Sequence, residues 1–79
     1  MMRIVSQDKM TDINYNDYSI CNVGNGIIAK PPVQPNASIF LGEYRTKVKT
    51  SMVMAEIRET WKKEIRIYYS SIVYEMPEV

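Results

Sequence analysis

Five basic residues between positions 45 and 66 are the side chains of this sequence best suited to binding an anionic ligand. Arg58, Lys62 and Arg66 recur every four residues, so in a helix they would lie along one flank. Arg45 and Lys47 precede this stripe, and a basic stripe can hold the phosphates of a nucleotide or a nucleic acid. Three glutamates interleave with it, however, and the chain carries ten Lys and Arg against nine Asp and Glu, a net charge of +1. This balance favours a solvated helix face over a phosphate-binding site.

Catalytic and metal-binding side chains are scarce. The sequence has no histidine and a single cysteine, which excludes Ser-His and Cys-His nucleophile pairs, an ordinary zinc site and an internal disulfide. The cysteine, Cys21, has no basic neighbour in the adjacent sequence, so we expect a small buried apolar side chain rather than a reactive thiol. The run DKMTDINYND, residues 8–17, has acidic residues spaced loosely like a calcium loop, but the central glycine and final glutamate are missing. We therefore expect no enzyme, no metal and no cofactor.

The length of 79 residues predicts a single domain, residues 1–79. A domain of this size buries only about 60–65% of the surface of its unfolded chain, and a partner subunit often supplies the missing stability. A homodimer is therefore expected. No window approaches the ~20 apolar residues of a membrane span, and the opening MMRIVSQDKM has no apolar signal-peptide core. These features predict a cytoplasmic protein with no membrane contact.

Hydrophobic patterning and turn residues divide the chain into strands and one helix. The stretch VGNGII, residues 23–28, places Gly and Asn between two β-prone runs, which is typical of a tight hairpin. Three prolines in KPPVQPN, residues 30–36, indicate a stiff extended connector. The predicted strands cover residues 3–6, 17–23, 26–30, 37–44 and 71–76, and the predicted helix covers residues 47–67.

The order of these elements predicts an α+β domain. We expect a small antiparallel sheet of about four to five strands, with one β-hairpin, and one long amphipathic helix packed on one face. The strand at residues 37–44 is apolar on both sides, with Ile39 and Leu41 on one face and Phe40 and Tyr44 on the other. One helix covers only one face of a sheet. Phe40 and Tyr44 are therefore candidate contacts with a second subunit.

The predicted helix has two different faces. An apolar stripe with a period of 3.6 residues is expected to pack on the sheet. Val48 and Met52 project to the opposite side with Ala55 beside them, and in an isolated chain these side chains would be exposed. These three residues are candidate contacts with a partner protein. The core stripe consists of Val53, Met54, Ile57, Trp61, Ile65 and Tyr68.

Five short motifs span nearly the whole chain: MRIVSQD (2–8), DINY (12–15), LGEY (41–44), VMAEIRETW (53–61) and YEMPE (74–78). In this order they resemble the small uncharacterised proteins carried by phages, prophages and mobile elements of Firmicutes. Proteins of that group open with an Ile-Val-Ser-Gln-Asp stretch. They carry a Gly/Ala-Glu-Tyr-Ser-Thr run before a Met-x-x-Ile/Leu-Arg helix, and they end on an aromatic-x-aromatic/Met-Pro segment.

The resemblance implies an accessory protein that binds a host or phage protein in the cytoplasm of the bacterial host. The most specific function that the resemblance implies is inhibition of a bacterial defence system. It assigns no catalytic residue to this chain. In that group the run after Glu-Tyr is rich in charge, so Val48 and Met52 depart from the pattern and favour a contact particular to this chain. Two alternatives stay open. One is a nucleotide- or nucleic-acid-sequestering protein with Arg45, Lys47 or Arg66 at a dimer seam, and the other is a structural or regulatory module.

Overall fold

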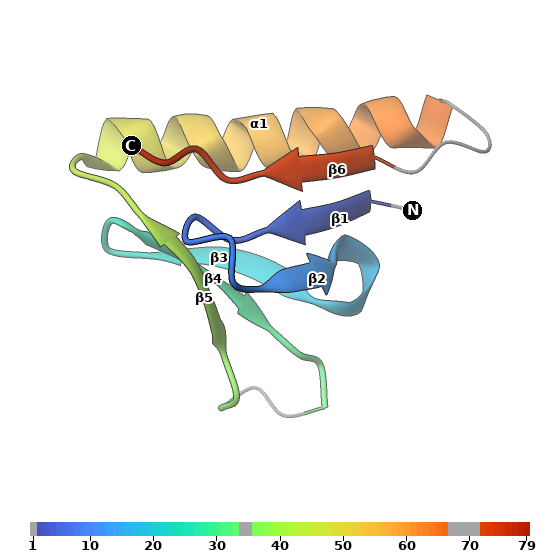
Figure 1. The fold of residues 1–79 in the computed structure, drawn as a ribbon, viewed down its shortest axis with the longest axis horizontal. Coiled ribbons are helices and arrows are strands. Elements are labelled where there is room, and N and C mark those ends of the chain that lie inside the picture. The colour runs from blue at the N-terminus through green and yellow to red at the C-terminus, as the bar shows by residue number, and fades with distance from the viewer. Residues whose placement is uncertain (1, 34–35, 67–71) are drawn as a thin grey trace.

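The computed structural model describes residues 2–33, 36–66 and 72–79. Over these residues one long α-helix lies along one side of the molecule and six short strands lie beneath it (Figure 1). Within the described ranges, no helix combines the length and the apolar character that a membrane span requires. The elements are, in order, β1 (Met2–Val5), β2 (Asp12–Asn14), the 3-10 helix η1 (Tyr15–Asp17), β3 (Ser19–Val23), β4 (Gly26–Lys30), β5 (Ile39–Glu43), α1 (Lys47–Arg66) and β6 (Ile72–Glu75).

The described strands form two three-stranded sheets. In the first, β1 lies between β2, which is antiparallel to it, and β6, which is parallel to it. In the second, β3, β4 and β5 follow in chain order and are antiparallel. Because α1 carries the chain back to the end of the molecule at which β1 begins, β6 runs beside β1 in the same direction (Figure 1). The fold is thus of the predicted α+β class.

The prediction of one antiparallel sheet with four to five strands and a single hairpin was wrong. Strand β2 was not expected, because it has three residues of which only Ile13, paired with Ile4, is buried. One apolar residue between two polar residues is too short a pattern to predict a strand. The sequences of β1 and β6 do not indicate that these two strands pair in parallel. Their pairing depends on where α1 leaves the chain.

Strand β3 begins at Ser19 rather than at residue 17, because the preceding residues form η1. The Asn14 side chain caps this turn, its Oδ1 accepting a hydrogen bond from the Asn16 N–H at 3.1 Å. Asn and Asp side chains commonly stabilise such turns at the expense of a strand. The predicted start of the last strand at residue 71 and the predicted end of the helix at residue 67 lie outside the described residues.

The turn between β3 and β4 lies where the glycines predict it. Gly24 has a φ of +59°, a left-handed conformation that glycine adopts without strain. The carbonyl oxygen of Asn25 in the same turn accepts hydrogen bonds from the Tyr44 N–H at 3.0 Å and from the Thr50 hydroxyl at 2.9 Å. The hairpin turn therefore also fixes the point at which β5 ends and α1 begins.

A β-bulge in β5 changes which side chains face the core. Ile28 pairs with Phe40 and Ile27 pairs with Gly42, so Leu41 has no residue opposite it. Leu41 and Gly42 both turn toward the core, and the alternation of side chains is inverted beyond them. Tyr44 consequently lies inside, 4% exposed, while Phe40 stays outside. The prediction that Phe40 and Tyr44 share a face was wrong for this reason.

Helix α1 begins where it was predicted, after Thr46, whose hydroxyl oxygen accepts a hydrogen bond from the Lys49 N–H at 3.1 Å. The predicted core stripe is confirmed where it is described: Val53 and Ile57 are buried, and Met54 and Trp61 are partly buried against the core. The side chain of Ile65 and all of Tyr68 lie outside the described residues.

One core is shared by both sheets and the helix. Strands β1 and β2 of the first sheet and β4 and β5 of the second contribute to it from below, and α1 covers it. Over residues 47–63, whose side chains are described, α1 thus has one side toward the core and the other toward solvent. The buried apolar residues are Met2, Ile4, Ile13, Ile27, Ala29, Leu41, Tyr44, Val53, Ile57 and Met76.

Candidate protein-binding site

The side of α1 that faces away from the core carries an exposed apolar pair. Val48 is 71% exposed and Met52, one helical turn further along, is 53% exposed. Ala55, on the next turn, is exposed as well. The prediction that these side chains point away from the core is thus confirmed. Their contact with a partner stays a prediction.

A shallow hollow lies over this part of the helix. It has a volume of about 430 Å³ and is lined by Lys47, Val48, Ser51, Met52 and Ala55. We call these five residues the outward α1 face. Ser51 was not singled out from the sequence, although its place three residues after Val48 puts it on the same side of a helix. The hollow has room for one or two side chains of a partner, and its apolar lining suits aliphatic or aromatic groups.

Arg58 and Lys62 of the predicted stripe lie one turn apart on α1, while Lys47 lies about three turns before Arg58 and Arg45 precedes the helix. Lys47 borders the outward α1 face and Arg58 is exposed further along the helix. Lys62 is exposed too, with its Nζ 3.4 Å from Glu59 Oε1. The side chain of Arg66 lies outside the described residues. The positive charge near the outward α1 face is therefore local, and one pair of opposite charges offsets part of it.

Arg45 lies in a different hollow, of about 350 Å³, between the start of α1 and the C-terminal segment. Lys49 lines the same hollow, and so do the acidic residues Glu43 and Glu78. Two positive and two negative side chains leave little net field for an anion. Tyr44, predicted as a contact residue, forms part of the wall of this hollow but belongs to the core.

Two tyrosines near Glu56 of α1 are weaker acids than an ordinary tyrosine. Burial raises the pKa of the Tyr44 hydroxyl from 10.0 to about 12, and the negative charge of Glu56 adds to this effect. Burial also raises the pKa of Tyr74, helped by the hydrogen bond of 2.8 Å that its hydroxyl donates to Glu56 Oε2. A phenol that holds its proton this firmly is a poor acid or nucleophile near neutral pH. The pair acts as a neutral, hydrogen-bonded part of the fold.

These shifts predict a loss of stability in alkaline solution. Above pH 10 the unfolded tyrosines ionise while Tyr44 keeps its proton until about pH 12, so the unfolded chain binds fewer protons and the free energy of unfolding falls. Below pH 10 both states are protonated and this contribution is fully present. Urea unfolding at a series of pH values measures the slope, and the double variant Tyr44→Phe/Tyr74→Phe should show a shallower one. An equal slope in both proteins would contradict the assignment.

Three of the five motifs meet around the side chain of Gln7. Its Nε2 donates hydrogen bonds to the carbonyl oxygens of Glu43 at 3.0 Å and Glu78 at 2.7 Å, and its Oε1 accepts one from the Glu43 N–H at 2.9 Å. Close by, the Tyr44 hydroxyl donates to the Pro77 carbonyl oxygen at 2.8 Å. The motifs at residues 2–8, 41–44 and 74–78 thus bind one another through main-chain atoms. Their role in this chain is to hold the fold together.

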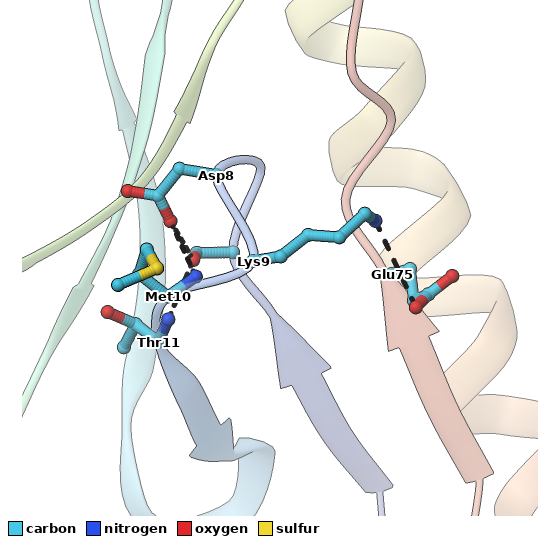
Figure 2. A network of polar contacts seen from close by, with 6 residues as sticks. Asp8, Lys9, Met10, Thr11 and Glu75 are labelled. Carbon is cyan, nitrogen blue, oxygen red and sulfur yellow. Dashed lines mark hydrogen bonds and ion pairs between the residues drawn. The ribbon is translucent and has the colours of Figure 1, made fainter.

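The acidic run is a turn with its own hydrogen bonds. Asp8 Oδ1 accepts a hydrogen bond from the Ser6 hydroxyl at 2.6 Å. It also accepts one from the Met10 N–H at 2.9 Å (Figure 2). These bonds hold the pKa of the Asp8 carboxyl below its ordinary value. Lys9 Nζ lies 3.9 Å from Oε1 of Glu75, at the end of the neighbouring strand β6 (Figure 2). Within the described ranges no three His, Cys, Asp or Glu side chains are placed to hold a metal ion.

Phe40 and Cys21 lie on the side of the β3-β4-β5 sheet that faces away from the core. Phe40 is 56% exposed, and Cys21 is half-buried rather than fully buried as expected. They belong to β3 and β5, which lie below the helix in Figure 1, whereas the outward α1 face belongs to α1 itself. The five residues predicted as protein contacts therefore fall into separate places.

No protein-family model, no curated protein and no solved structure matches the chain.

Proposed function

We propose that this chain is a non-enzymatic protein that acts by binding another protein through the outward α1 face. The observation that carries the proposal is the exposure of Val48 and Met52, neighbours on a helix whose opposite side already supplies the core. Folding does not require these two side chains. An apolar patch that the fold leaves uncovered is typical of a contact surface.

The chemistry around this face describes the partner. The centre is apolar and Lys47 lies at its edge. Further along α1, Arg58 is exposed and the exposed Lys62 is paired with Glu59. A complementary segment would place apolar side chains in the hollow and carboxylates around them. An amphipathic helix with acidic residues beside its apolar stripe meets this description, since helices pack on one another through such stripes.

The biological setting of the proposal rests on the resemblance of the ordered motifs to proteins of Firmicutes phages and mobile elements. We place the partner among host or phage proteins, and inhibition of a bacterial defence system is the specific form of the function. The test is phage infection of a host that carries such a system. Expression of the chain should restore plaque formation, and expression of a chain with the outward α1 face disrupted should not.

Met52→Asp should abolish partner binding while leaving the chain folded. A carboxylate in the middle of the outward α1 face repels an acidic partner and removes apolar contact, whereas the 53% exposed side chain contributes little to the core. The matched control is Val33→Asp, which makes a similar change at an 87% exposed site in the connector after β4. Proteins captured from a bacterial lysate by the unmodified chain should be lost with Met52→Asp and retained with Val33→Asp.

Retention of the same proteins by both variants would overturn the assignment of the site. Circular dichroism and urea unfolding should show equal stability for the two variants, which separates lost binding from lost folding. The nucleic-acid alternative is tested with labelled single-stranded DNA. Tight binding that weakens steeply with salt would replace the proposal with a phosphate-binding function.

A further inference from the structure

The β3-β4-β5 sheet carries a second apolar surface on the side away from the core. Cross-strand partners lie on the same face of a sheet, so Cys21, Ile28 and Phe40, which pair in register, form one row across it. Val23, 62% exposed, extends the surface along β3. This surface is separate from the outward α1 face and is not used in the proposed function. We call it the outer sheet face: Cys21, Val23, Ile28 and Phe40, with Lys30 and Glu43 at its two ends.

The two ends of the outer sheet face carry opposite charges. Lys30 lies two residues beyond Ile28 on β4, and Glu43, opposite Gly26, lies at the other end. Both are exposed. With a rise of about 3.4 Å per residue, each charge lies about 7 Å from the central row. The surface therefore has a positive end, an apolar centre and a negative end. A second copy turned end to end would place its negative end over the positive end of the first.

Two such faces can meet in two symmetric ways. A two-fold axis along the central row reverses the strands, so that Lys30 of one copy comes over the end that bears Glu43 in the second copy. A two-fold axis along β4 instead sets Lys30 against Lys30 of the second copy, which repels, and places Glu43 over Val23 of that copy. Gly26 lies between Val23 and Glu43 in its row, and the Phe40 ring lies over it, 3.4 Å from where a Cβ would be. Charge therefore selects the first arrangement.

We propose that the outer sheet face binds a second copy of this chain, face to face, with the strands of the two sheets antiparallel. The central rows then coincide, so that each Phe40 ring lies near the same ring of the other copy and Cys21 lies opposite Cys21. Packed sheets are about 10 Å apart, which sets the separation of the two Cys21 backbones. That distance is too long for a disulfide, which needs Cα atoms less than about 7 Å apart.

The expected dimer is weak. Three strands about 4.8 Å apart and five residues long give a face of roughly 14 by 17 Å, which is about 240 Å² of flat area per copy. A standard interface buries about 800 Å² per partner. The two copies should therefore separate on dilution and associate at high protein concentration.

Cysteine crosslinking tests the arrangement, because Cys21 is the single cysteine and any covalent dimer joins one copy to another. A bis-maleimide with a reach shorter than about 10 Å should give a covalent dimer of the full chain in native buffer, because both Cys21 side chains point into the space between the sheets. The product should be absent in urea and absent for Cys21→Ser. Sedimentation velocity at several concentrations should show the same association without the reagent.

Charge reversal supplies the decisive control. Lys30→Glu sets like charges against each other and should reduce the covalent dimer to background. The double variant Lys30→Glu/Glu43→Lys restores opposite charges and should restore the product. Phe40→Asp should also abolish it, whereas Met52→Asp, on the outward α1 face, should leave it unchanged. Circular dichroism confirms that each variant is folded.

Three outcomes would overturn the proposal. The first is a monomer at every concentration. The second is a dimer that Lys30→Glu leaves intact or that the double variant fails to restore, because the contact then lies elsewhere. The third is a dimer lost with Met52→Asp but not with Phe40→Asp, which would assign self-association to α1. This last result would also contradict the proposed function, while the first two would not touch it.

Discussion

Replacing Gln7 by alanine should lower the free energy of unfolding by about 2–3 kcal/mol, since three hydrogen bonds to main-chain atoms are lost at about 1 kcal/mol each. The side chain joins the turn after β1 to Glu43 in β5 and to Glu78 near the end of the chain. Water replaces part of the loss, because these bonds are exposed to solvent. In a domain this small, whose total stability is about 4–12 kcal/mol, the change is large.

Gln7→Glu is the matched variant for this prediction. Its carboxylate still accepts from the Glu43 N–H but faces two carbonyl oxygens to which it has no proton to donate. At neutral pH it should be at least as unstable as Gln7→Ala. In acid the protonated carboxyl regains one donor, so the gap to the unmodified chain should narrow. Urea unfolding measures both effects, and a loss below about 0.5 kcal/mol for Gln7→Ala would place Gln7 among ordinary surface residues.

Ile57→Ala should cost about 3 kcal/mol, whereas Val48→Ala on the same helix should change stability by less than about 0.5 kcal/mol. Ile57 is 1% exposed within the core, so truncation loses apolar contact and leaves a cavity. Val48 projects into solvent. Alanine is the best helix former, so intrinsic helix preference lowers neither variant.

Urea unfolding of the two variants under the same conditions compares the two sides of α1 directly. A loss of similar size for both would mean that Val48 is covered within the folded chain. The outward α1 face would then not be available to a partner. The measurement therefore checks the structural basis of the proposed function without knowledge of the partner.

The sequence predicted α1 and its two faces well because the signal is redundant. A period of 3.6 residues repeats over the 20 residues of the helix, so no single residue decides the phase. The turn at Gly24 was predicted for a different reason, because few residues adopt its positive φ. The sheet pairing was not predictable in this way. Whether β6 pairs with β1 depends on where α1 returns the chain, and strand sequences carry little information about it.

The candidate site was predictable in the helix and not in β5. The exposure of Val48 and Met52 follows from helix phase alone. Tyr44 was placed on the wrong face because one extra residue at the bulge inverts the strand, and Gly42 is the only hint of it in the sequence. In the structure Gly42 is packed tightly: a Cβ there would lie 3.1 Å from Gln7 Cβ. The bonds of Gln7 to distant main-chain atoms have no local pattern at all.

The most direct test of the proposed function is photo-crosslinking from the outward α1 face in bacterial cells. A photoreactive phenylalanine analogue at position 52, with the same analogue at position 33 as control, captures whatever lies against each site. We expect a covalent adduct from position 52 whose mass differs from that of two copies of the chain, and no such adduct from position 33. The absence of an adduct from position 52, or the same adducts from both positions, would contradict the binding of a partner protein by the outward α1 face.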